Sequence, residues 1–136
     1  MRGPHCLKTW SATQGPIALS SAEAEYYAMV DNTLKAMGIR TMAEEIGIFG
    51  MSGPVVLHTD SNSAKSFASR RGLGKARHIQ TRCLWLQQAV ADRQVMVRKV
   101  AGARKPADIL TKYLPRELAH RMAELMGMHL VWRPPA

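Results

Sequence analysis

The chain has 136 residues, of which 46% are hydrophobic and 21% charged, and its formal net charge is +9. This length and composition suit one domain with a buried core and argue against general disorder. No apolar run approaches the ~20 residues that cross a bilayer, and the N-terminus lacks the apolar core of a signal peptide. We therefore expect an intracellular protein, cytoplasmic or nuclear, with no membrane partner.

The net charge indicates the kind of partner, and the cysteines indicate which kinds of cysteine-rich site are absent from the sequence. A surplus of positive charge favours an acidic polymer such as nucleic acid as partner, although a merely basic, soluble protein remains an alternative. Cys6 and Cys83 are the only cysteines. Two isolated cysteines make neither a zinc knuckle nor a disulfide framework, so both are predicted to be free thiols.

The first elements are an extended segment and a long helix. Residues 7–17 are predicted to be one strand-like segment with a bend at Gly15 and Pro16. Ser20 is the expected helix N-cap, with Glu23 three residues later completing a capping box. The helix is predicted to run to about residue 45 and to stop at Gly47 and Gly50. Its predicted buried face consists of Tyr26, Met29, Val30, Thr33, Leu34 and Met37.

The middle of the chain alternates between strands and helices. Residues 55–59 form a short, largely apolar run rich in β-branched residues, which predicts a strand buried on both faces. A short helix is expected over 61–69, then a flexible basic loop over 70–75. A helix over 78–91 and a strand over 95–100 follow.

The last third is expected to hold a loop over 102–106, a helical turn over 107–110 and an amphipathic helix over 116–126. Residues 133–136 are predicted to be a disordered tail. The alternation of strands and helices along the whole chain predicts an α/β layer with a partly parallel sheet.

Three carboxylates follow or open predicted elements: Glu25 at a helix start, Asp60 at a strand end, and Asp108 at a helical turn. Ligands of α/β folds collect at the carboxyl edge of the sheet, and carboxylate oxygens are natural ligands of Mg²⁺. We therefore predict that the three share one sheet edge. The alternatives are a first-turn acid for Glu25, a turn aspartate for Asp60 and a helix-start acid for Asp108.

A basic segment lies between Asp60 and Asp92, where there is no acidic residue. A positive surface beside carboxylates suits a polyanion that must approach a metal site. Trp10 or Trp85 is a candidate for stacking on a base, with core packing as the favoured alternative. The predicted nucleic-acid contacts are Ser61, Asn62, Lys65, Arg70, Arg71, Lys75, Arg77, His78, Arg82 and Lys112.

Four blocks of sequence resemble one known family. Residues 20–26 read SSAEAEY, 58–64 read HTDSNSA, 75–79 read KARHI, and 107–115 read ADILTKYLP. Together, and in this order, they resemble the ribonuclease H domain of copia-type (Pseudoviridae) retrotransposon polyproteins. The resemblance covers about residues 6–115 and makes residues 1–115 a partial ribonuclease H-like domain, followed by a helix and tail over 116–136.

The resemblance implies a mixed five-stranded sheet flanked by helices and metal-dependent hydrolysis of the RNA strand of RNA–DNA hybrids. It assigns catalysis and metal binding to Glu25, Asp60 and Asp108, with two Mg²⁺ ions, or Mn²⁺ in their place. The expected partners are an RNA–DNA hybrid or another nucleic acid, and the remainder of a retrotransposon polyprotein.

The chain departs from this family at its start. Nothing before Cys6 matches the family's first two strands or the first of its four carboxylates, an aspartate. We therefore expect an N-terminally truncated domain with impaired cleavage, because a lost bridging ligand weakens metal binding. Two alternatives remain open: a non-catalytic nucleic-acid-binding remnant, and a structural fragment that needs a partner strand.

Overall fold

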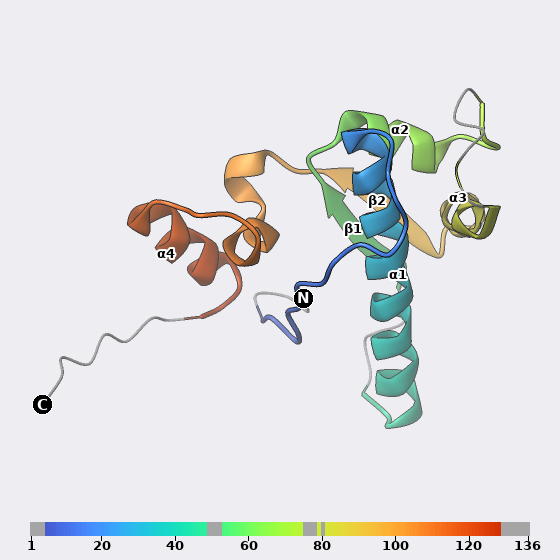
Figure 1. Ribbon diagram of the computed structural model, residues 1–136. Coiled ribbons are helices and arrows are strands. Elements are labelled where there is room, and N and C mark those ends of the chain that lie inside the picture. Colours follow the sequence, from blue (N-terminus) through green and yellow to red (C-terminus); the bar gives the residue numbers. More distant parts are fainter. Residues whose placement is uncertain (1–4, 49–52, 75–78, 80, 129–136) are drawn as a thin grey trace, which may run out of the picture. The chain divides into compact units, whose positions relative to one another are not determined.

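The computed structural model describes residues 5–48, 53–74, 79 and 81–128. The chain divides into two compact units, one made of residues 14–99 and the other of residues 1–13 and 100–136. Helices and a small parallel sheet make the fold α/β, as predicted (Figure 1). In the part of the chain that is described, no helix is long and apolar enough to cross a membrane.

Helix α1, Ser21–Glu45, begins as the sequence predicts. The Ser20 hydroxyl accepts a hydrogen bond from the Glu23 amide at 3.2 Å, and the Glu23 carboxylate accepts one from the Leu19 amide at 2.9 Å. Glu23 thus caps one residue further out than in a standard capping box. The helix passes through Gly38 without a break and ends at Glu45, two residues before Gly47, whose φ of 75° favours glycine.

The first half of α1 is better buried than the second, where Ala43 is buried but most side chains are not. Its predicted face is confirmed at Tyr26, Met29, Val30 and Thr33, whereas Leu34 is 54% exposed, contrary to the prediction. Figure 1 shows why: the second half of the helix runs past the two strands, which are too few to cover it.

Strands β1, Val55–Thr59, and β2, Val95–Lys99, pair in parallel, with Val55 opposite Val95 and Thr59 opposite Lys99. One face packs on the core, and the other leaves Val56 and Met96 each 42% exposed. The prediction of a strand buried on both faces was therefore wrong. The helices of this unit supply apolar side chains to one face only.

The predicted strand over residues 7–17 is also absent, since the described part of that segment contains no strand. The chain bends at Gly15 and Pro16, as expected. Proline lacks an N–H group and cannot donate to a ladder, and the segment is divided between the two units. These features leave it as irregular chain.

Helix α2, Asn62–Ser69, matches its predicted range, and helix α3, Trp85–Ala91, follows a 3₁₀ turn at Thr81–Leu84. The helix predicted over 78–91 thus begins later, since its opening turn is 3₁₀ and has no side-chain cap. His78 lies outside the described residues.

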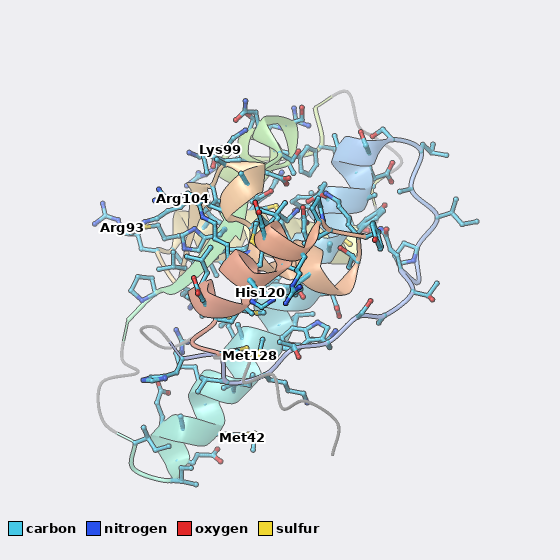
Figure 2. All side chains as sticks on the ribbon, turned by 90° about the vertical axis from the view of Figure 1, so that its left-hand side faces the viewer. Met42, Arg93, Lys99, Arg104, His120 and Met128 are labelled. Atoms are coloured by element: carbon cyan, nitrogen blue, oxygen red, sulfur yellow. The ribbon has the colours of Figure 1, made fainter. Side chains whose placement is uncertain are left out.

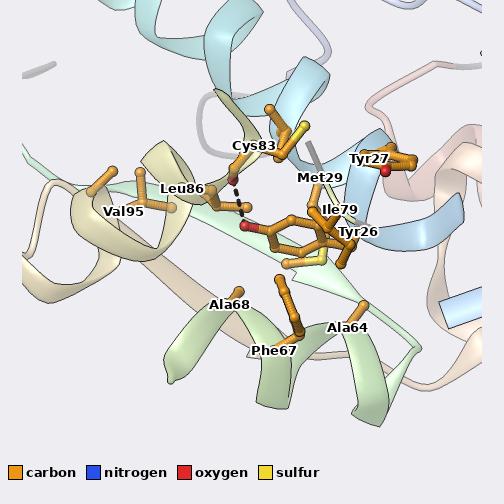
Figure 3. Close-up of a cluster of buried hydrophobic side chains, with 12 residues drawn as sticks. Tyr26, Tyr27, Met29, Ala64, Phe67, Ala68, Ile79, Cys83, Leu86 and Val95 are labelled. Carbon is orange, nitrogen blue, oxygen red and sulfur yellow. Dashed lines mark hydrogen bonds between the residues drawn. The ribbon is translucent and has the colours of Figure 1, made fainter. Parts of the chain in front are cut away.

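The core of this unit is centred on two rings. Tyr26 and Phe67 meet edge to face with centroids 4.5 Å apart, and the Tyr26 hydroxyl donates to the Cys83 carbonyl at 2.5 Å (Figure 3). Leu86 and Val95 pack in the same cluster. Helix α1 is thereby joined to α2, to the segment before α3 and to β2.

The other unit contains 3₁₀ turns at Gly102–Arg104 and Pro106–Leu110, and helix α4, Arg116–Leu125. Met122 and Ala123 form the buried side of α4, while Leu125 is exposed. The Cys6 amide donates to the Met126 carbonyl at 3.1 Å, which ties the N-terminal segment to the end of the helix. The predicted disordered tail lies outside the described residues. The domain limits that the resemblance implies, residues 1–115 and 116–136, stay a prediction.

Candidate functional site

The carboxyl ends of β1 and β2 lie at one edge because the strands are parallel. Asp60, half-buried, follows β1, and Lys99 ends β2. The Lys99 ammonium donates to the Asp60 backbone carbonyl and to the Asn62 side-chain oxygen, each at 2.8 Å. The side chain of Lys99 is drawn as sticks and labelled in Figure 2. Asp60 therefore sits in a turn that the neighbouring strand holds.

Local hydrogen bonds shape the same turn. The buried Thr59 hydroxyl accepts from the Ser61 amide at 3.1 Å, and the Ser61 hydroxyl accepts from the Ala64 amide at 3.1 Å. Ser61 is thus the N-cap of α2. Its predicted contact with nucleic acid would have to coexist with this structural role.

Glu25 lies on the first turns of α1, half-buried, in the same unit as Asp60. Its neighbour Glu23 is 5% exposed and caps the helix, so the predicted capping role of Glu23 is confirmed. Glu25 is left for another role, and its predicted role in metal binding stays a prediction.

Asp108 belongs to the other unit, where it is 8% exposed. Its carboxylate forms an ion pair with Lys112 at 2.8 Å and a longer one with Lys105 at 3.9 Å. Lys112, predicted to contact nucleic acid, is engaged with Asp108. The predicted meeting of Asp108 with Glu25 and Asp60 remains a prediction. Among the described residues, no three histidine, cysteine, aspartate or glutamate side chains gather as a group that could hold a metal ion.

A cavity of about 470 Å³ opens between the start of α1 and helix α2. Serine hydroxyls and the charged Glu23 and Arg70 supply polar groups, and the rings of Tyr26 and Phe67 supply apolar surface. The lining residues are Ser20, Ala22, Glu23, Tyr26, Asn62, Ser63, Ser66, Phe67, Arg70 and Ile79. Sequence reasoning did not find this cavity, although serines at both helix starts were visible in the motifs.

The described part of the basic loop after α2 makes several hydrogen bonds, and its predicted flexibility stays a prediction. The buried Gln87 side chain accepts from the Gly72 amide at 2.8 Å and donates to the Phe67 carbonyl at 2.8 Å. Arg70 donates to the Leu73 carbonyl at 2.8 Å and lies over the Phe67 ring at 4.2 Å. Arg70 therefore shapes the loop as well as lining the cavity.

The other predicted nucleic-acid contacts are spread over the same region. Lys65 is half-buried on α2, and Arg71 is exposed in the loop. Lys75, Arg77 and His78 lie outside the described residues, as does the side chain of Arg82.

The predictions for the two tryptophans proposed to stack on a base have different outcomes. Trp85 is partly buried against the core, which supports the core-packing alternative over base stacking. Trp10 is half-buried and engaged in a contact, and its predicted stacking on a base is untested.

Comparison with known proteins relates the chain to a transposon polyprotein. The chain is 34% identical over 121 residues, 88% of its length, to the retrovirus-related Pol polyprotein from transposon TNT 1-94 of Nicotiana tabacum. The chain spans about 9% of the length of that polyprotein. This similarity supports a retroelement origin for the chain. No protein-family model matches the sequence, and no solved structure matches the fold.

Proposed function

We propose that the chain is a ribonuclease H-type part of a retrotransposon polyprotein, which acts on the RNA strand of RNA–DNA hybrids. The observation that carries the proposal is Asp60, a half-buried carboxylate at the carboxyl end of β1, within the chain's similarity to a Pol polyprotein. The four motif blocks that resemble the copia-type ribonuclease H domain add the reaction class.

The chemistry of the donor set fits Mg²⁺ or Mn²⁺. Glu25 and Asp60 offer carboxylate oxygens in one unit, and Asp108 offers them in the other. These three residues would hold the ions, which supply charge neutralisation and an activated water for phosphodiester hydrolysis. Of this chain's own parts, Thr59, Ser61 and Lys99 fix the turn that presents Asp60.

Binding of the nucleic acid would fall to the surface around α2. The cavity beside Asn62, Ser63 and Ser66 supplies uncharged hydrogen-bonding groups. Lys65 and Arg71 supply positive charge for phosphates. Such contacts read backbone and sugar instead of sequence, so recognition is expected to be largely independent of sequence.

The test is cleavage of a 20-base-pair RNA–DNA hybrid with labelled RNA by the purified chain, with Mg²⁺ and with EDTA. Wild type is expected to shorten the RNA only with Mg²⁺, while Asp60→Asn, which keeps the size of the side chain, is expected to lose this activity at least a hundredfold, about 3 kcal/mol in barrier height. Equal cleavage by both proteins would show a contaminant and contradict the proposal.

A second candidate function is hybrid binding without cleavage. The ion pairs of Asp108 with Lys112 and Lys105 favour it, because a carboxylate already neutralised by lysines is a poorer ligand for a metal ion. Salt-dependent binding of the hybrid by wild type and Asp60→Asn alike, with intact RNA in both, would select this function.

A further inference from the structure

Lys99 stabilises the turn at Asp60, which follows β1, although the two residues are 39 positions apart in the sequence. Its ammonium has three N–H donors, and two of them are used, on the Asp60 carbonyl and on Asn62 Oδ1. Lys99 stands opposite Thr59 in the sheet register, so the neighbouring strand places its stem directly beside the turn. Within the described ranges of the chain, the third N–H makes no hydrogen bond and can meet solvent or a ligand.

The bond to Lys99 decides which way the Asn62 amide faces. An asparagine amide offers one oxygen acceptor and two N–H donors, and the two ends are interchangeable by a flip. Because Lys99 can only donate, the Asn62 oxygen must face it. The Asn62 nitrogen, with both donors, then faces away, and among the described residues its side chain makes no other hydrogen bond.

The surroundings of Asn62 suit a polar ligand. Asn62 is exposed on the first turn of α2 and lines the cavity together with Ser63 and Ser66. Amide donors and serine hydroxyls complement an uncharged acceptor such as a ribose hydroxyl or a base-edge oxygen.

We propose that Lys99 is a positioning residue that locks Asn62 as a hydrogen-bond donor to the sugar or base edge of a bound nucleic-acid strand. This proposal rests on the proposed function, because it takes a nucleic acid as the ligand. It assigns a role to Lys99 that goes beyond a general positive charge for phosphates.

The decisive variant is Asn62→Asp. It keeps an oxygen for Lys99, so the turn and the thermal midpoint should be retained, but it replaces the outward donors with an acceptor. Affinity for a fluorescein-labelled RNA–DNA hybrid is expected to fall roughly tenfold, since a bound acceptor would lose its partner. Wild-type affinity in Asn62→Asp would overturn the proposal.

Lys99→Met, alone and combined with Asn62→Ala, distinguishes a positioning role of Lys99 from a role of its positive charge. Lys99→Met should weaken binding roughly fivefold in wild type but hardly at all in an Asn62→Ala background, because coupled residues give non-additive effects. Lys99→Arg, which can still donate, should retain most of the affinity. Full additivity of Lys99→Met and Asn62→Ala would show that Lys99 acts only as a charge, and would overturn the proposal.

An NMR measurement on the free protein keeps the two proposals distinct. The Asn62 side-chain amide resonances are expected to shift in Lys99→Met and to stay in place in Lys99→Arg. If they respond in this way but wild type binds no hybrid, the proposed function fails and the recognition role with it, while the Lys99–Asn62 lock stands. If they do not respond, the lock itself is refuted, whatever binds.

Discussion

Tyr26 shows how one side chain can carry both packing and polarity in this fold. Its ring meets Phe67, and its hydroxyl reaches the Cys83 carbonyl 57 residues away. We predict that Tyr26→Phe lowers the free energy of unfolding by about 1–2 kcal/mol, because a buried carbonyl loses its donor while the apolar contacts persist. Urea denaturation followed by circular dichroism measures this, and an unchanged midpoint would contradict it.

The same residue makes stability depend on alkaline pH. Burial, reinforced by Cys83 and opposed by Arg70, raises the pKa of the Tyr26 phenol well above its usual value of 10. The folded state therefore holds this proton more tightly than the unfolded state. Its contribution to stability is complete below pH 10 and declines as pH rises further. Tyr26→Phe should flatten this decline in thermal melts between pH 9 and 11.

The side-chain roles that were predicted correctly from the sequence involve contacts between residues close together in the chain. Ser20 and Glu23 cap within four positions along the chain, and such contacts follow from local geometry. Lys99 and Gln87 were missed because their partners lie 37 to 39 and 15 to 20 residues away. A lysine at a strand end suggests a solvated charge until the partner strand is known.

At the scale of elements, a glycine in the second, more exposed half of α1 lowers the stability of this helix. Gly38 lies inside the helix with no atom near the position of a Cβ, so alanine fits there. We predict that Gly38→Ala raises the free energy of unfolding by about 0.5–1 kcal/mol, because the unfolded chain loses freedom and the helix gains propensity.

Gly47→Ala is the matched control. The φ of Gly47 is 75°, a conformation that an alanine adopts only with strain, so this change is expected to destabilise the protein. Thermal melts of the two variants should therefore shift in opposite directions. A decrease for Gly38→Ala would show that the second half of α1 is not helical in solution.

The order of elements was predictable because periodicity and caps are local signals. Helices α1, α2 and α4 and both strands were predicted within a few residues of their bounds. The prediction of a strand over residues 7–17 was wrong because a strand needs a partner edge, and the described sheet pairs β1 only with β2. A local sequence pattern contains no information about such a partner.

At the scale of the whole molecule, the net charge of +9 makes the proposed nucleic-acid binding testable through its dependence on salt. A protein that neutralises phosphates releases counterions, so the logarithm of its affinity falls linearly with the logarithm of salt concentration. The sequence predicted this charge and its concentration between Asp60 and Asp92. It did not predict the division into two units, which depends on contacts between the chain's two ends.

We predict that Lys65→Gln and Arg71→Gln each lower the salt slope of hybrid binding by about 1, if each contacts one phosphate. Lys65 lies on α2 and Arg71 in the loop that Gln87 anchors, beside the cavity. Lys35→Gln is the control, because Lys35 on α1 is already paired with Asp31 and removal of its charge should leave the slope nearly unchanged. Fluorescence anisotropy between 50 and 300 mM salt, as about six concentrations, gives the three slopes. Equal decreases in all three variants would mean that the hybrid senses only net charge, and that the surface around α2 is not the binding face.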